Sequence, residues 1–110
     1  MDSTKKSEDK TKDAEDNEVR EKLRGEVDLA PWQALRSHAE AERLFLAASD
    51  LDLVEIGLAL ARDQSAPVNA WIAAGQLARP TPPQLAAWDE TDEQIFRCLI
   101  VAPFVLAQET

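Results

Sequence analysis

The residues of this chain that could do chemistry are few and scattered. Asp89, Glu90, Asp92 and Glu93 form an acidic cluster that could be imagined as a site for a hard cation. A specific calcium loop, however, spaces its ligands along the chain and includes a turning glycine. This segment has neither feature. We therefore interpret the cluster as solvated surface and expect no metal site.

The single histidine and the single cysteine do not form a reactive set. His38 has no second histidine and no cysteine near it in sequence with which to share a metal ion. Cys98 lies inside an apolar run, where a thiol is generally buried and unreactive. One cysteine excludes an intramolecular disulfide, which favours a reducing compartment. We expect a cytoplasmic protein without a cofactor.

Recognisable catalytic motifs are also lacking. With three glycines there is no glycine-rich phosphate loop, and no serine stands in a nucleophile-elbow setting. Asp52 and Glu55 share one face of a predicted helix, but capping and the helix dipole explain both carboxylates without chemistry. We expect that the protein is not an enzyme. A small enzyme or a metabolite-binding protein is kept as the second alternative.

Charge is distributed unevenly along the chain. Residues 1–24 hold seven of the twelve basic residues and eight of the twenty-one acidic ones, whereas residues 25–110 have five arginines, no lysine and a net charge of −8. Such a domain repels nucleic acid, whose binding depends on neutralisation of phosphates by Lys and Arg. To reverse this, all five arginines would have to converge on one face: Arg36, Arg43, Arg62, Arg79 and Arg97.

The clearest structural signal is the stretch 49–77, which predicts two helices joined by a tight turn. Ser49 and Asp52 resemble a capping box, and a nearly continuous apolar segment follows, as in a helix covered on more than one side. Ser65 restarts the pattern as an N-cap, and Gly75 suits a left-handed C-cap. The pair is either a helix-turn-helix unit or an ordinary helical hairpin.

The second of these helices is the candidate interaction surface. Its sequence, SAPVNAWIAAGQ, contains no basic residue, so only Asn69 and Gln76 could hydrogen-bond to the edges of nucleic-acid bases. The face is small and uncharged, and Trp71 is of a type enriched at protein interfaces. The surface therefore comprises Asn69, Trp71 and Gln76. In the alternative interpretation, Trp71 fills the core.

The other elements follow from local signals. Residues 1–17 are charged and almost devoid of apolar side chains, so we expect a disordered tail followed by a single globular domain at residues 18–110. A short helix from Glu18, a helix from Pro31 and a helix capped by Thr81 are predicted from turn, proline and capping signals. Short strands are predicted at residues 43–48 and 76–79.

The most apolar stretch, residues 95–108, predicts a strand that is broken or bulged at Pro103, with a helix as the alternative. The fold class is therefore α+β: a small helix-rich domain with a central helix-turn-helix-like pair and a short sheet of two or three strands. The order of elements also permits a winged-helix-like topology, with the wing formed by the strands at 76–79 and 95–108.

Several framework segments resemble a known family. They are Trp32, LDLVEIGLALARD at 51–63, WIAAGQL at 71–77, Trp88 and the closing VAPFVLAQE. This pattern resembles the DUF2288 family, an uncharacterised bacterial family catalogued as a domain of unknown function, over roughly residues 18–109. Phe104 stands where the pattern has a tryptophan. The resemblance implies one globular domain and assigns no catalytic residue.

Together these patterns indicate a small acidic cytoplasmic protein that acts as a non-catalytic protein-interaction or regulatory module. Its expected partner is an unknown protein or a second copy of the chain. A winged-helix-like nucleic-acid-binding regulator is the alternative, which the charge disfavours. No signal segment opens the chain and no apolar run approaches the roughly 20 residues of a membrane span, so we expect no membrane association.

Overall fold

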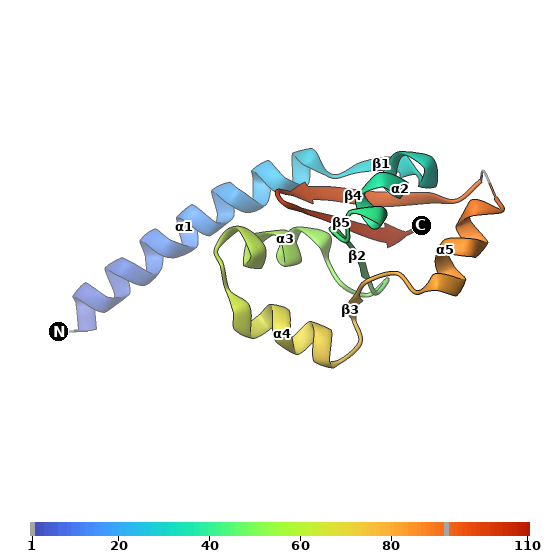
Figure 1. The fold of residues 1–110 in the computed structure, drawn as a ribbon. Coiled ribbons are helices and arrows are strands. Elements are labelled where there is room, and N and C mark those ends of the chain that lie inside the picture. The colour runs from blue at the N-terminus through green and yellow to red at the C-terminus, as the bar shows by residue number, and fades with distance from the viewer. Residues whose placement is uncertain (1, 92) are drawn as a thin grey trace.

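The computed structural model describes residues 2–91 and 93–110, and side chains from residue 14 onward. In this part of the chain, five helices and five strands follow one another (Figure 1). Their order is α1 (Asp2–Glu26), β1 (Asp28–Pro31), α2 (Trp32–Glu40), β2 (Leu44–Ala47), α3 (Leu53–Ala61), α4 (Ser65–Ala73), β3 (Leu77–Ala78), α5 (Pro82–Asp89), β4 (Ile95–Val101) and β5 (Phe104–Glu109).

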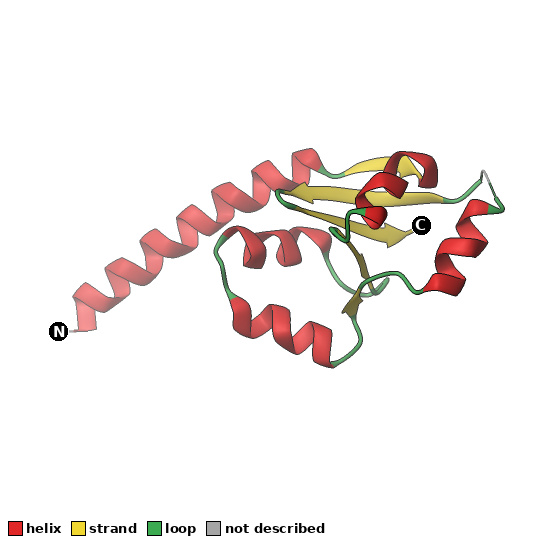
Figure 2. Ribbon diagram, viewed as in Figure 1, coloured by secondary structure: helices red, strands yellow, loops and turns green. Residues whose placement is uncertain are grey.

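The strands form one mixed sheet in the order β1-β4-β5-β2-β3 (Figure 2). Strand β2 runs parallel to β5, and the other neighbours are antiparallel. The predicted α+β class is confirmed. The predicted size of the sheet is wrong, because the sheet has five strands rather than two or three.

The winged-helix arrangement does not form. A wing would pair β3 with the C-terminal strand, but β2 lies between β3 and β5 in the sheet. Strands β2 and β5 are apolar and lie inside the sheet, each with a neighbouring strand on both sides. Strand β3 has only two residues and lies at the edge. Local sequence signals do not specify which strands become neighbours.

The C-terminal stretch is extended, as predicted in preference to a helix. It is divided at Ala102 and Pro103 into β4 and β5, which pair as a hairpin from Val101↔Phe104 to Phe96↔Glu109. Proline has no N–H to donate to a strand ladder, so it terminates pairing there. Strand β1 was not predicted, because its four residues carry no clear alternation.

Two hydrophobic clusters lie on opposite faces of the sheet. One joins α1, α3 and α4 to the sheet and is centred on Ile56, Leu99 and Leu106. The other joins α2 and α5 to the sheet through Trp32 and Trp88. In the second cluster the ring centroids of Trp32 and Trp88 lie 5.0 Å apart, and both rings pack against Phe96. The helices thus cover both faces of a twisted sheet.

Helix α1 differs from the sequence-based expectation. Disorder was predicted for residues 1–17, whereas the structure has one helix from Asp2 to Glu26 (Figure 1). Leu23 is buried and Val19 and Val27 pack against the same cluster, so the C-terminal half is anchored. Once a helix is nucleated, each further residue adds a hydrogen bond at small cost. Where the globular domain begins within α1 stays a prediction.

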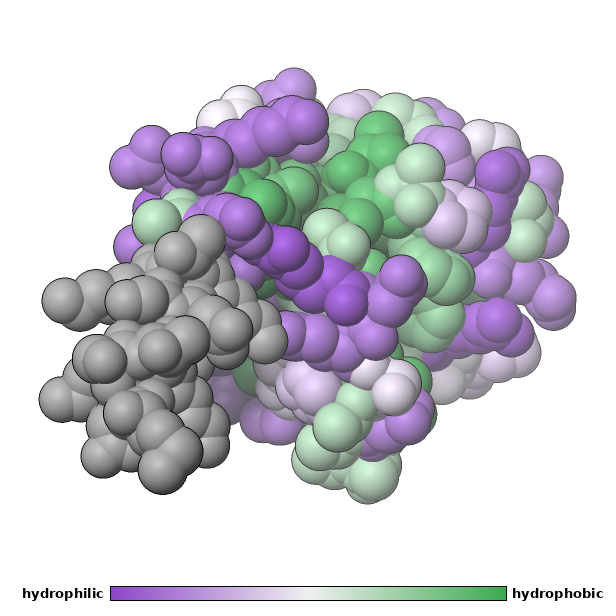
Figure 3. Space-filling model, turned by 90° about the vertical axis from the view of Figure 1, so that its left-hand side faces the viewer, coloured by the Kyte–Doolittle hydropathy of each residue, from purple (hydrophilic) through white to green (hydrophobic). Residues whose placement is uncertain are grey.

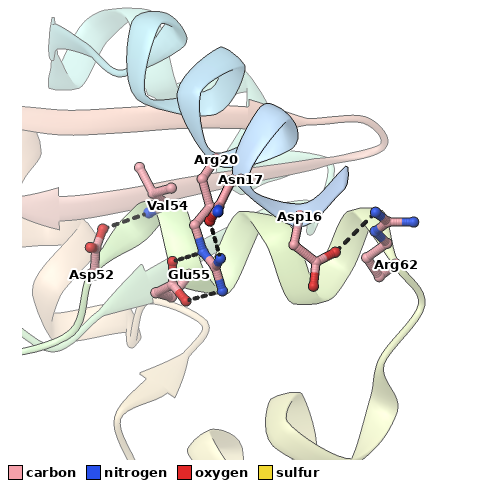
Figure 4. Close-up of polar contacts among 7 residues, drawn as sticks. All are labelled: Asp16, Asn17, Arg20, Asp52, Val54, Glu55 and Arg62. Atoms are coloured by element: carbon pink, nitrogen blue, oxygen red, sulfur yellow. Dashed lines mark hydrogen bonds and ion pairs between the residues drawn. The ribbon is translucent and has the colours of Figure 1, made fainter. Parts of the chain in front are cut away.

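Ion pairs extend the contact between α1 and α3 beyond the apolar residues (Figure 4). Arg20 donates from Nε and Nη2 to the two carboxylate oxygens of Glu55, at 2.8 and 3.2 Å. One turn earlier, Asp16 Oδ1 lies 2.9 Å from Arg62 Nη2 at the end of α3. Contacts between α1 and α3 therefore already occur at Asp16, before residue 18, where composition places the start of the globular domain.

The predicted pair of helices within residues 49–77 is confirmed as α3 and α4. Helix α3 begins later than expected, because Asp52 rather than Ser49 is its N-cap and accepts from Val54 N at 2.9 Å. The chain doubles back after α3, so α4 returns along it as a helical hairpin (Figure 1). The capping box predicted at Thr81 and Gln84 is present at the start of α5.

Candidate functional site

Helix α4 carries two of the predicted site residues, Asn69 and Trp71, and is only weakly buried. None of its residues is buried, and its sequence SAPVNAWIA has no charged side chain. A helix that packs with no fully covered face leaves apolar surface open on its flanks. The geometry around α4 is therefore the first place to search for a binding site.

The structure does not bring the three predicted residues to one spot. Asn69 is exposed and lines a hollow beside the start of β5. Gln76 follows α4 and lines a different cavity of about 390 Å³, which also contacts Arg79 at the β3 edge. Trp71 is half-buried and packs against the cluster around Ile56. Their shared role as one interaction surface stays a prediction.

A hollow beside α4, which we call the α4 groove, is the more coherent feature. Its inner part has a volume of about 180 Å³, and all its lining residues are apolar: Phe45, Leu60, Val68, Ile72, Leu77, Phe104 and Leu106. Leu60, Val68 and Phe104 also line the neighbouring hollow of about 230 Å³ that contains Asn69. The two hollows therefore form one continuous groove between α4, the end of α3 and the sheet.

The groove has a rigid aromatic wall and little charge. The rings of Phe45 and Phe104 meet edge to face with centroids 5.7 Å apart. The guanidinium of Arg79 lies 5.6 Å from the centroid of Phe45, so its charge is directed onto a ring face. Asp63 is the charged residue that lines the outer hollow. Ile72 is 47% exposed at the rim, which leaves an aliphatic side chain open to a partner.

Figure 3 views the end of the molecule that carries α1 and the β4–β5 turn. Hydrophobic surface gathers in the upper half of this view, above a band of hydrophilic side chains. Ile100 of β4 contributes to the exposed apolar surface of the protein with 59% of its area accessible. Apolar surface is therefore exposed on the β-hairpin as well as beside α4.

The β1 edge of the sheet is poorly suited to pairing with another strand. The Leu29 N–H already donates to the Asp28 carboxylate at 2.8 Å, and Pro31 has no N–H. Edge strands that lack free donors are protected from strand addition. The groove, rather than this edge, is the better candidate for a protein contact.

The acidic cluster has a structural role that the sequence did not reveal. Asp89 Oδ1 accepts from the indole Nε1 of Trp32 at 2.7 Å and lies 3.6 Å from Arg36 Nε. Asp92 lies outside the described residues. Among the residues that are described, no three or more His, Cys, Asp or Glu side chains come together as a metal ion would require.

The thiol of Cys98 lies half-buried in β4. Burial, followed by the negative charge of Asp28, raises the pKa of this thiol above its ordinary value, against an opposing backbone hydrogen bond from Asp28. The side chain is therefore a protonated thiol at neutral pH, which is a poor nucleophile. Asp52 and Glu55 are likewise engaged, in the cap of α3 and the ion pair with Arg20.

The comparisons with known proteins agree with the fold. A family model described as "Protein of unknown function (DUF2288)" matches residues 18–109. The chain belongs to this DUF2288 family. The chain is also similar to the NMR solution structure of PA1075 from Pseudomonas aeruginosa, with 32% sequence identity, a TM-score of 0.69, and coverage of 79% of this chain and 80% of that one. No curated protein matches the chain.

The matched range contains every residue of the α4 groove and begins within α1. Sequence reasoning missed the groove because its walls come from five separate elements of the DUF2288 domain. A local signal existed at Phe45 and Phe104, which are aromatic residues in a chain with few of them. Their pairing depends on the parallel contact of β2 with β5, which periodicity does not predict.

Four of the five arginines in residues 25–110 lie on different elements and do not gather on one face. Arg36 lies beside Asp89 on the α2 and α5 face, and Arg62 pairs with Asp16 at the end of α3. Arg79 stacks on Phe45, and Arg97 lies on β4 beside Gln108.

None of the helices in the described part of the chain has the length and apolar character that a membrane span needs.

Proposed function

We propose that this DUF2288 domain is a non-catalytic protein-interaction module, whose α4 groove receives an apolar side chain from a basic protein segment. The observation that carries the proposal is the groove itself: its inner part is lined by apolar residues alone, and Ile72 stands open at the rim. Exposed apolar surface of this kind, with a rigid aromatic wall, suits the insertion of a partner side chain.

The charge of the domain supports a basic partner. Residues 25–110 have a net charge of −8, so a segment rich in Lys or Arg is attracted over a long range. A second copy of the chain carries the same charge and is repelled. The groove supplies the apolar contact and the net negative charge of the domain supplies the steering.

Two observations support this role over the alternatives. Helix α4 offers no basic residue to a nucleic acid, and Arg36, Arg62 and Arg79 lie apart on different elements. The protonated Cys98 thiol and the engaged carboxylates of Asp52 and Glu55 support a role without catalysis.

The proposal is tested by NMR titration of the ¹⁵N-labelled protein with a synthetic amphipathic helical peptide of Leu and Lys. We expect saturable shifts of the backbone amides of Val68, Ile72 and Phe104. The Ile72→Glu variant should weaken binding at least about tenfold, since it places a charge in an apolar contact. Ile100→Glu is the matched control, because Ile100 is also exposed, at 59% against 47% for Ile72, but lies outside the groove, and it should bind as the parent does.

Three results would contradict the proposal. The first is the absence of saturable shifts around the groove. The second is equal binding of a peptide in which Glu replaces Lys, since charge would then have no role. The third is a concentration-dependent dimer in light scattering that Ile72→Glu abolishes and Ile100→Glu preserves, because the occupant would then be a second copy of the chain.

A further inference from the structure

A second hollow, which we call the arginine pocket, lies on the same face of the sheet but shares no residue with the α4 groove. It has a volume of about 400 Å³. Its walls come from the end of α1, the loop that precedes α3, and strands β4 and β5. The residues that matter chemically are Arg24, Val27, Ser49, Leu51, Arg97 and Gln108.

Two guanidinium groups in this pocket are left without a carboxylate partner. Arg36 and Arg62 each pair with acidic residues, whereas no ion pair among the described side chains involves Arg24 or Arg97. The body of the domain is strongly acidic, whereas in this hollow the two guanidinium groups outnumber the one carboxylate, that of Asp52, and form a local site of positive charge. Such a site attracts an anion.

The buried side-chain amide of Gln108 holds Arg97 and the loop before α3 in place. Gln108 is only 3% exposed, and its Nε2 donates to the carbonyl oxygens of Ala48 and Leu51, both at 2.7 Å. Its Oε1 accepts from Arg97 Nη1 at 3.4 Å. The side chain therefore fixes the loop before α3 and orients Arg97 before any ligand arrives, which lowers the cost of binding.

We propose that the arginine pocket binds a small organic carboxylate, with the carboxylate between Arg24 and Arg97 and the apolar part of the ligand against Val27 and Leu51. The planar guanidinium fork matches a carboxylate group. Asp52 also lines the pocket, and its Oδ1 is engaged as the cap of α3. Its negative charge opposes anions of higher charge, so a single carboxylate is accepted in preference to a phosphate.

The experiment is an NMR titration of the full chain with hexanoate at constant ionic strength, with 1-hexanol and inorganic phosphate in parallel. Hexanoate should give saturable shifts of the backbone amides of Ser49, Leu51 and Val54 and of the Arg97 side chain. Arg24→Gln and Arg97→Gln should each weaken binding about tenfold, the usual effect of removing one charge-assisted contact. Arg36→Gln removes the same charge on the opposite face and should leave binding unchanged.

The Asp52→Asn variant gives the sharpest test. Asparagine keeps the N-cap of α3 but removes the opposing charge, so hexanoate should bind several-fold more tightly. The proposal is overturned if hexanoate gives no saturable shifts at the pocket, or if hexanol or phosphate binds there equally well. It is also overturned if Arg36→Gln weakens binding as much as Arg97→Gln does, because the effect would then be long-range. The amide spectrum of each variant verifies that it is folded.

Discussion

Replacing Gly57 by alanine should destabilise the protein, although the same change is normally favourable inside a helix. Gly57 lies in the middle of α3, where alanine is ordinarily better by about 0.5–1 kcal/mol. A Cβ at this position would lie 2.8 Å from Leu99 Cδ2 and 3.3 Å from both Leu23 Cδ1 and Val101 Cγ2. Leu99 is completely buried in a close-packed core, so its side chain can yield only by displacing its neighbours.

The magnitude follows from these two opposing effects. Overpacking of a close-packed core costs about 1–3 kcal/mol. From the middle of that range, about 2 kcal/mol, subtracting the helix-propensity gain of about 0.5–1 kcal/mol leaves a net loss of about 1–1.5 kcal/mol in the free energy of unfolding. For a domain of this size, we expect a fall of roughly 5–10 °C in Tm.

Urea denaturation followed by circular dichroism and tryptophan fluorescence measures this loss. Gly25→Ala is the matched control, since Gly25 also lies in a helix but a Cβ there meets no atom within 4 Å. The control should be neutral or more stable by up to about 0.5–1 kcal/mol. If Gly57→Ala proves as stable as the parent or more so, the close packing of α1, α3 and β4 described above is refuted.

Three further predictions concern polar side chains. Gln108→Leu should lower the free energy of unfolding by about 2–4 kcal/mol in urea denaturation, because the carbonyls of Ala48 and Leu51 lose their buried donor. A loss below about 1 kcal/mol would show that the Gln108 amide does not hold the loop before α3. Asp89→Ala should cost about 1–3 kcal/mol by removing the acceptor of the Trp32 indole, and an unchanged stability would contradict that contact. Because the pKa of Cys98 is raised in the folded state, the unfolded chain ionises first, so stability should decline as pH rises above the usual thiol value of 9.0. Cys98→Ala should remove that part of the decline when both proteins are denatured in urea between pH 7 and 10, and equal declines would refute it.

Local signals in the sequence were sufficient for most of the helices. The threonine cap and prolines before α5, the apolar run of α3 and the restart at Ser65 each depend on residues within one turn of one another. The extended conformation of the C-terminal stretch was likewise predictable, as was its interruption at Pro103. Such features are set by backbone hydrogen bonding and side-chain type over a few residues, which the sequence displays directly.

The candidate sites could not be predicted in the same way. Asn69, Trp71 and Gln76 are neighbours in sequence, yet Asn69 and Gln76 line different hollows and Trp71 packs against the core, because a helix and its cap turn successive side chains through large angles. Gln108 carried a signal that went unused: it is a polar residue at the end of the most apolar stretch. A side chain of this kind is buried only when partners are provided, and those partners lie about 60 residues earlier in the chain.

The sequence by itself determined the α+β class, the two helices α3 and α4, the net negative charge and the family to which the chain belongs. Tertiary structure alone decided the strand order, the anchoring of α1, the α4 groove and the arginine pocket. These features depend on contacts such as β2 with β5 and Arg20 with Glu55. Their free energy comes from burying surfaces that are distant in sequence, and no local pattern specifies which surfaces meet.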